Sequence, residues 1–274
     1  MKFYNIQKCI FISIIIVLTQ NVYSQDTAFE EQAFFKKLEH SYYDLGSTGV
    51  KNFTVLLTNL RTEVFAKNNW NNKEIFPLQL IWHSSDRVFL AEQGVPALSD
   101  SSKKTYTPMV SDLKKQITGV LYDLKRFYFS GIDKSISQDY TLKKAGNFIE
   151  VKFNSVFEGD STYFTYYFGE NGLCLKIVAE TPTKNTKVET YPHFKIVKTK
   201  WLVTGWEVQM SENNKIQTGF VINLKSKMYN DVWVPSDMMI AVQQTKTPGT
   251  TFNDSIKFRN FLFNQPLQFI QPTK

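Results

Sequence analysis

The sequence predicts a mainly β protein of the α+β class, with a curved antiparallel half-barrel of about ten or eleven strands covered by two or three helices. From Asp139 to Asn264 the chain is an almost unbroken series of two-residue alternations separated by short polar turns. The segment 216–224 alternates most clearly, and this pattern predicts that one of its faces is buried. A sheet with one apolar face needs a cover, and few segments of the chain have helical periodicity.

The first 24 residues have the features of a cleaved secretory signal. Lys2 and Lys8 precede an apolar run at 9–18 that is too short to span a bilayer, and Val22 and Ser24 occupy the −3 and −1 positions of a cleavage site. No pair of small residues precedes the cysteine in this run, as a bacterial lipoprotein signal would require. We therefore expect cleavage after Ser24 and a periplasmic or secreted protein without a lipid anchor; the alternative is an uncleaved anchor.

Residues 25–274 are predicted to form a single domain, because no linker rich in Pro, Ser or Gly and no internal repeat divides them. The formal charge of the full chain is +7, and removal of the two signal-peptide lysines lowers it to +5. The lysines are spread over turns and strand faces, so no nucleic-acid partner is expected. Cys174 is the only thiol outside the signal, and we expect it to be buried within a strand.

Two helices are predicted from apolar side chains at spacings of three and four residues. The first covers 28–45, and Gly46 follows its end. The second covers 110–128, between Pro108 and Gly131, and we expect it to pack on the sheet as a core helix; the alternative is a mobile lid. Its apolar stripe consists of Val110, Leu113, Ile117, Val120, Leu121, Leu124, Phe127 and Tyr128, and its predicted polar side of Asp112, Lys114, Lys115, Asp123, Lys125 and Arg126.

Turn signals separate the predicted strands. A hairpin is predicted from 75–82 and 87–91, with Pro77 near the start of its first strand. Asn171 and Gly172 mark a second hairpin. Further strands are predicted at 148–153, 163–168, 173–177, 194–203, 206–210, 216–225, 232–242 and 256–263. A flat sheet does not hold this number of strands, so we expect it to curl into a half-barrel or a closed barrel.

The sequence contains no signature of catalysis, metal binding or cofactor binding. None of the three histidines has a second ligand-type residue at metal spacing, and there is no nucleophile elbow or Gly-rich phosphate loop. Carboxylate pairs such as Asp237 with Asp254, or Glu150 with Glu180, could meet across a sheet, but any sheet protein offers such pairs. We therefore predict no catalytic residue, no cofactor and no metal site, and a protein that is not an enzyme.

Aromatic residues make up 15% of the chain, and both faces of the predicted strand 163–168 carry rings, which is more than a thin, one-sided core needs. In the predicted strand 163–168, Phe164, Tyr166 and Phe168 share one face, and rings occupy the other face as well. These side chains either line a groove for a lipid- or peptide-sized ligand or fill the space between sheet and helices. The candidate ligand lining consists of Leu113, Ile117, Val120, Leu121, Leu124, Phe164, Tyr166, Phe168, Phe220 and Ile222.

The order of elements resembles the LolA/LolB-like superfamily of periplasmic lipoprotein carriers. The matching pieces are the N-terminal helix ending in Tyr42 and Tyr43 and the segments 49–53, 80–88, 233–237 and 256–264. The resemblance implies a half-barrel whose concave apolar face is covered by helices and takes acyl chains. It also implies that 50–65, which the residues alone leave as strand or helix, is largely strand. The chain departs from the family pattern in its long 108–130 helix and its extra strand length.

Together these features predict a non-enzymatic exported protein of the cell envelope that binds a hydrophobic ligand between sheet and helices. The expected ligand is an acyl chain, a lipopeptide or an apolar peptide, so the expected partner is a lipid or lipopeptide. The alternative is a structural or interaction module, whose barrel is filled by side chains and whose partner is another envelope protein. No transmembrane segment is expected in the mature chain.

Overall fold

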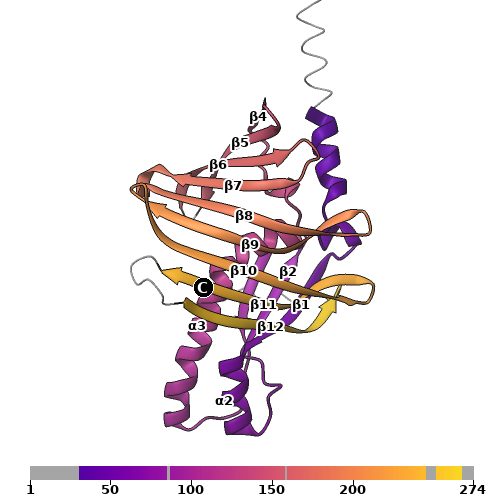
Figure 1. Cartoon of the computed structure of the whole chain (residues 1–274). Helices are drawn as coiled ribbons and strands as arrows, with labels where there is room; N and C mark the ends of the chain where they lie inside the picture. Colours follow the sequence, from indigo (N-terminus) through magenta and orange to yellow (C-terminus); the bar gives the residue numbers. More distant parts are fainter. Residues whose placement is uncertain (1–30, 85–86, 158, 245–250, 267–274) are drawn as a thin grey trace, which may run out of the picture.

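The computed structural model describes residues 31–84, 87–157, 159–244 and 251–266, so the predicted signal and its cleavage site lie outside the described residues. A single antiparallel sheet of twelve strands organises the chain, in the order β3-β2-β1-β12-β11-β10-β9-β8-β7-β6-β5-β4 (Figure 1). The sheet is open, with β3 and β4 at its edges, so the alternative of a closed barrel is wrong. Within the described ranges, no helix is both long and apolar enough to cross a membrane.

The sheet has more strands than the sequence predicted. The strands are β1 Asn52–Asn59, β2 Leu78–His83, β3 Arg87–Glu92, β4 Tyr140–Ala145, β5 Phe148–Phe157, β6 Asp160–Gly169, β7 Cys174–Thr181, β8 Thr186–Val197, β9 Lys200–Glu212, β10 Lys215–Tyr229, β11 Val232–Gln244 and β12 Thr251–Phe263. The predicted strand at 194–203 is wrong, because the chain turns at residues 198 and 199, between β8 and β9. Lys198 adopts a left-handed φ of 57° there, and a lysine is not a turn signal.

Other turns follow the predicted chemistry. Asn213 and Asn214 join β9 to β10, and Asn230 and Asp231 join β10 to β11, all four with positive φ. Two successive left-handed residues match the twist of a tight antiparallel hairpin, and Asn and Asp tolerate that conformation. Gly172 has a φ of 87° in the β6–β7 connection, which confirms the hairpin predicted there. The hairpin of β2 and β3 is also confirmed.

The buried face predicted for 216–224 is confirmed in its second half only. Ile222 and Leu224 are buried, whereas Ile216 is 56% exposed. A register shift between Ile216 and Thr218, in the pairing of β10 with β9, interrupts the alternation. One extra residue in a strand moves the side chains before it relative to those after it.

The first predicted helix is shorter than expected. The described chain is helical over 31–41, and Tyr42 then forms a bridge with Trp201 of β9. The Tyr42 hydroxyl donates to the carbonyl of Gly172 at 2.8 Å and accepts from the backbone N–H of Cys174 at 2.6 Å. These bonds tie the end of the helix to the β6–β7 turn, and therefore the predicted end at residue 45 is wrong.

The ambiguous segment 50–65 contains both structures. β1 ends at Asn59, and α2, Leu60–Trp70, begins with the next residue. The Asn59 side chain accepts from the backbone N–H of Thr62 at 3.0 Å, and the Thr62 hydroxyl accepts from the backbone N–H of Asn59 at 3.1 Å. This capping box satisfies two backbone donors and starts the helix, so the expectation of a largely strand segment is wrong.

The long helix α3, Asp100–Leu124, begins ten residues before its predicted start. The Ser99 hydroxyl caps it by accepting from the backbone N–H of Ser102 at 3.2 Å. Pro108 lies inside the helix, so its predicted place at the start is wrong. A π-helical turn, η2 Lys125–Phe129, completes the helix.

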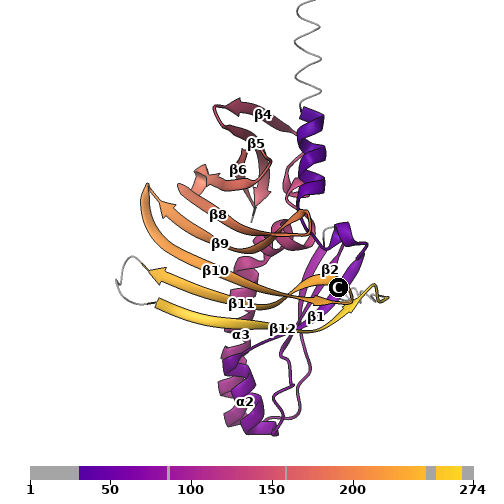
Figure 2. The same cartoon turned by 45° about the vertical axis from the view of Figure 1, so that its right-hand side comes forward.

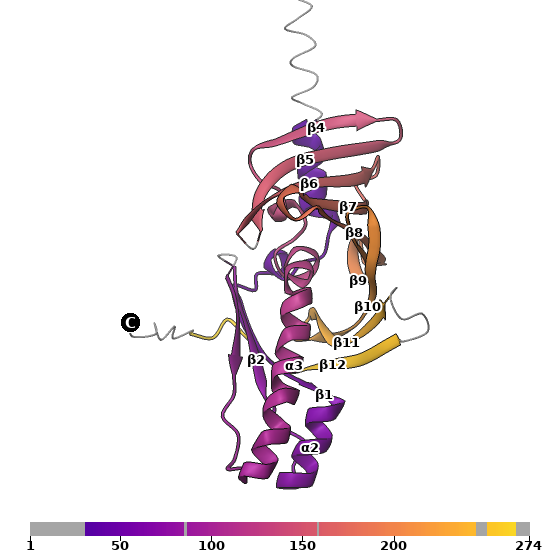
Figure 3. The same cartoon turned by 90° about the vertical axis from the view of Figure 1, so that its left-hand side faces the viewer.

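The helix α3 is the central element of the core. It lies between β1 and β2 on one side and β8 to β10 on the other (Figure 3). The N-terminal part of α3 pairs with α2 away from the sheet, where Phe65, Trp70 and Tyr106 pack ring against ring (Figure 2). The expected core helix is thus confirmed along its stripe, because Leu113, Ile117 and the other stripe residues are buried except for half-buried Leu121.

Candidate functional site

Most of the predicted ligand lining belongs to the packed core. We call the sheet face that carries buried Trp206 and Ile222 the inner face. The buried members of the predicted set are Leu113, Ile117, Val120, Leu124, Phe164, Tyr166, Phe168 and Ile222. Leu121 and Phe220 are only half-buried. The eight buried side chains pack into one cluster and fill the space between α3 and the sheet.

The inner face becomes less covered from β6 toward β9. Cross-strand pairing places Phe164, Ala179, Val188 and Met210 in one row across β6, β7, β8 and β9. Phe164 is buried, Ala179 and Val188 are half-buried, and Met210 is 39% exposed. We call these four residues the inner-face row. The row is apolar throughout and open at one end, because β8 to β11 extend past α3 (Figure 1).

The neighbouring row repeats this change. Tyr166, Ile177 and Val208 are buried on β6, β7 and β9, whereas Phe220 of β10 and Val242 of β11 are half-buried. Buried Thr190 of β8 pairs with both Ile177 and Val208, and the pairing of Val208 with Phe220 and of Phe220 with Val242 continues this row. The exposed part of the inner face therefore spans β8 to β11 and lies beside α3.

One face of α3 contacts β6 and β12. Tyr122 stacks on Phe164 with ring centroids 6.3 Å apart, and the Gln116 amide donates to Asp254 Oδ2 at 3.0 Å. Gly119 lies three residues from each and thus on the same face. A Cβ at Gly119 would meet no atom within 4 Å. Leu121 is about 100° around the helix from Tyr122, so it belongs to a neighbouring face.

A cavity of about 390 Å³ opens beside the C-terminal end of α3. Its described lining residues are Tyr122, Lys125, Arg126, Ser130, Gly131, Lys134, Ser135, Ile136, Ser137, Phe153, Ser155 and Val156, of which three are basic and none is acidic. We call it the basic cavity. It meets the inner-face row at Phe164, because both Tyr122 and Phe153 stack on that ring.

Arg126 forms a buried ion pair with Asp123, with 2.5 Å between Nη2 and Oδ1. Both residues were predicted to lie on the polar side of the helix, and this prediction is wrong. Burial raises the pKa of the Asp123 carboxyl, and Arg126 opposes that shift. For Arg126, burial lowers the pKa, but Asp123, Tyr166 and Tyr122 together raise it above its ordinary value. The guanidinium therefore stays charged inside the core.

Aromatic rings surround the guanidinium. Its Cζ atom lies 4.7 Å from the ring centroid of Phe127, 5.2 Å from that of Tyr122 and 5.9 Å from that of Tyr166. Arg126 Nε is buried and has no hydrogen-bond partner among the described residues. A partly satisfied buried cation beside a cavity, on a π-helical turn, is typical of a site adapted to function rather than to stability.

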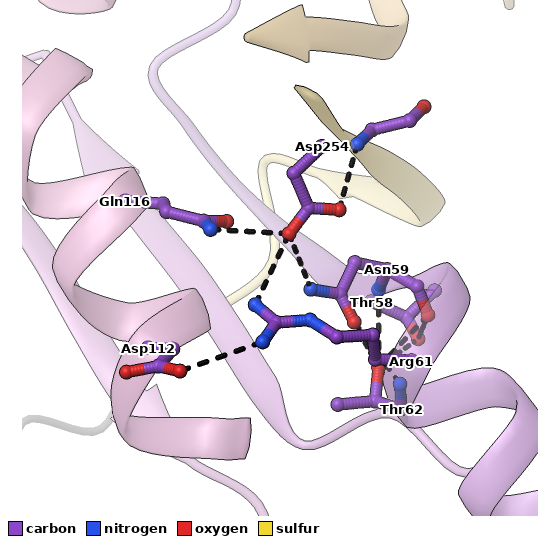
Figure 4. Close-up of polar contacts among 8 residues, drawn as sticks. Thr58, Asn59, Arg61, Thr62, Asp112, Gln116 and Asp254 are labelled. Carbon is purple, nitrogen blue, oxygen red and sulfur yellow. Dashed lines mark hydrogen bonds and ion pairs between the residues drawn. The ribbon is translucent and has the colours of Figure 1, made fainter. Parts of the chain in front are cut away.

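A second polar cluster joins β12 to α2 and α3 (Figure 4). Asp254 Oδ2 accepts from Asn59 at 3.1 Å, from Arg61 at 3.3 Å and from Gln116 at 3.0 Å, while Oδ1 accepts from the Ser255 backbone N–H at 2.8 Å. The Asp254 side chain is 7% exposed, and Arg61 also pairs with Asp112 at 3.4 Å. Four donors satisfy this carboxylate, and the cluster fixes α2 and α3 on the sheet.

The remaining candidate residues have structural surroundings. Asp237 pairs with Arg259 at 3.3 Å, and Glu150 pairs with Lys152 at 3.0 Å. Cys174 is buried as predicted, and burial raises the pKa of its thiol to about 12. The described ranges contain no cluster of His, Cys, Asp and Glu able to hold a metal ion.

Sequence reasoning missed Gly119, Asp123 and Arg126. One signal was present for the pair: Asp123 and Arg126 are three residues apart and lie among the apolar residues that end the helix. Searches with this chain found no matching family model, no matching curated protein and no matching solved structure.

Proposed function

We propose that this protein is a non-enzymatic binding protein of the cell envelope that holds an apolar chain against the exposed part of the inner face. The chain would lie across the inner-face row and beside Gly119. In this proposal the open sheet is a half-barrel of the LolA/LolB-like carrier kind, and its function is to carry the ligand rather than to transform it.

The supporting observation is that the exposed part of the inner face is apolar and that Gly119 of α3 lies beside it. A glycine within an exposed helix costs about 1 kcal/mol relative to alanine, so its presence calls for a reason. Gly119 is exposed, and a Cβ there would meet no described atom within 4 Å, so this helix position offers open space beside the sheet edge of the packed core. Met210 and half-buried Val188 would gain a cover when a chain occupies this space.

A second candidate function is an interaction module without a lipid ligand. The packing of eight predicted lining residues into the core favours it, because the interior between α3 and the sheet is filled. The exposed part of the inner face would then bind an apolar segment of another envelope protein. Mass spectrometry of an organic extract of the purified protein separates the two candidates: an acyl ligand supports the first, and an empty extract together with failed acyl-probe binding supports the second.

A matched pair of substitutions tests the place of binding. Gly119→Ala should stabilise the protein by about 0.5–1 kcal/mol and leave binding of a pyrene-labelled alkyl probe intact. Gly119→Trp should fill the space and weaken probe binding by about tenfold or more. Equal binding by both variants would show that the ligand does not lie at this helix face, and thermal melting of each variant checks that the fold is retained.

A further inference from the structure

We infer that the ligand is an anionic amphiphile, whose phosphate or carboxylate head group occupies the basic cavity while its apolar chain follows the inner-face row. This inference rests on the proposed function, since it adds a head-group site to the exposed part of the inner face, where the apolar chain of the ligand is proposed to bind. The cavity and the row share the rings of Tyr122, Phe153 and Phe164, so one molecule can occupy both.

The charge of the cavity favours an anion. Lys125, Arg126 and Lys134 line it, and no acidic residue is among its described lining residues. Asp44 and Asp133 lie close enough to Lys134 to interact with its charge, but neither is among those lining residues. Lys125 and Lys134, beside Arg126 whose charge is balanced by Asp123, line a volume of about 390 Å³ with room and net positive charge for a phosphate or carboxylate group.

Hydrogen-bond donors in the cavity complete the argument. Arg126 Nε lacks a partner among the described residues, although its residue is only 4% exposed. Ser135 Oγ lies 3.0 Å from the Tyr166 hydroxyl and 2.6 Å from the Ile132 carbonyl oxygen. The Ile132 carbonyl takes the Ser135 proton, so Arg126 and the ammonium groups of Lys125 and Lys134 are the cavity groups that can donate to phosphate or carboxylate oxygens.

The exposed part of the inner face can bind an apolar chain without the charged and polar side chains of the basic cavity. Asp123 already balances the Arg126 charge, but Nε has no partner among the described residues, and a neutral acyl chain offers no acceptor for it. An anionic head group would pair with the cations in the cavity at the moment of binding. In this inference the exposed part of the inner face binds the apolar chain of the ligand, and the basic cavity binds its head group.

The test compares three probes that share one pyrene-labelled alkyl chain and end in phosphate, hydroxyl or trimethylammonium. We expect the wild-type protein to bind the phosphate probe about tenfold more tightly than the hydroxyl probe, as one charge-assisted hydrogen bond provides, and the trimethylammonium probe most weakly. This preference should decrease as salt increases. Titration with inorganic phosphate alone distinguishes a free anion site from a head-group site.

Variants locate the preference. Lys125→Gln with Lys134→Gln should reduce the phosphate-to-hydroxyl preference to about threefold or less, while binding of the hydroxyl probe is retained. The matched control is Lys103→Gln with Lys104→Gln, which removes the same charge from the far end of α3 and should retain the full preference. A second variant, Asp123→Leu with Arg126→Met, removes the buried pair together and should also lose the preference.

Each remaining outcome is decisive. Equal binding of phosphate and hydroxyl probes would overturn the anionic head group and leave the proposed function standing. Failure of all alkyl probes to bind would overturn both. Binding of inorganic phosphate without any alkyl probe would indicate a site for a free anion and would also overturn both.

Discussion

Two buried carboxylates in this protein each meet an arginine, yet their surroundings differ. Asp254 accepts four hydrogen bonds from four residues, and its partner Arg61 reaches solvent, with 39% of its side chain exposed. Asp123 pairs with Arg126 among aromatic rings, and the buried Nε of Arg126 has no hydrogen-bond partner among the described residues. The first cluster joins three elements of the fold; the second borders a cavity.

We interpret this difference as one between a cluster that supports the fold and a pair that belongs to the proposed binding site. A fully satisfied polar cluster fixes the geometry and is complete without a ligand. A buried ion pair with donors to spare is a poor way to stabilise a core, since an apolar pair of similar volume often does as well. In the Asp254 cluster, Gln116 Oε1 is buried without a hydrogen-bond partner among the described residues. This atom is an acceptor on a neutral amide, whereas Arg126 Nε is a donor on a charged group.

The largest expected effect is at the cavity pair. Asp123→Ala leaves Arg126 buried without its counter-ion and should lower the free energy of unfolding by about 3–5 kcal/mol. Asp123→Leu with Arg126→Met should instead remain within about 1 kcal/mol of wild type or become more stable. Urea denaturation measures both. If Asp123→Ala lowers the free energy of unfolding by less than about 1 kcal/mol, solvent reaches Arg126.

The Asp254 cluster should respond less strongly. Asp254→Ala removes the acceptor of the Asn59 and Gln116 amides and should cost about 1–3 kcal/mol, because Arg61 can turn to water. Asp112→Ala, which removes an exposed partner of the same arginine, is the control and should cost no more than about 1 kcal/mol. Alkyl-probe affinity should not change in either variant. A loss of affinity in Asp254→Ala at full stability would contradict its supporting role.

A smaller effect separates hydrogen bonding from ring packing at the cavity. Tyr166→Phe removes the hydroxyl beside Ser135 and keeps the ring against Arg126. We expect a loss of about 1 kcal/mol in denaturant unfolding, because Ser135 still donates to the Ile132 carbonyl. Ser135→Ala should cost a similar amount. If Tyr166→Phe costs more than the Asp254 variant, the comparison between the clusters is wrong.

The smallest expected effect is at a solvent-facing carboxylate. Lys176, with smaller help from Lys187, holds the pKa of Glu189 at about 2, below its ordinary 4.5. The folded state is favoured by this pair above pH 4.5, and the advantage is lost as the pH falls toward 2. Since both lysines reach solvent, Glu189→Gln should cost under about 1 kcal/mol at pH 7 and nothing at pH 2. Thermal unfolding at the two pH values measures the difference, and an equal cost at both would exclude the ion pair as its source.

The sequence predicted those parts of the fold in which local pattern and tertiary role agree. Alternation around Ile222 predicted β10, and the left-handed Asn213 and Asn214 before it are one of the expected short polar turns, because period and turn chemistry agree there. Lys198 shows the limit, since its left-handed conformation follows from the pairing of β8 with β9 and not from its own preference.

The candidate site was predictable only in outline. An apolar inner face followed from periodicity, but its exposure depends on how far α3 extends over the strands. Arg126 appeared polar and solvent-facing on a helical wheel. It is buried because the rings of Tyr122, Phe127 and Tyr166 pack around it and the π-helical turn changes the spacing of side chains after Leu124. Such a position depends on tertiary structure, which periodicity does not describe.

The pairing of β1 with β12 has a kinetic consequence. Phe53 lies opposite Phe263, so the first strand of the sheet hydrogen-bonds to the last. Strands from β5 to β11 each pair with a neighbour in sequence and can form pairs in order, whereas β1 cannot join them until β12 is available. We expect pulsed hydrogen exchange during refolding to show protection of β9 and β10 amides before those of β1. A chain still emerging from the ribosome or a translocation channel would then keep β1, β2 and β3 unpaired with the rest of the sheet until β12 has emerged.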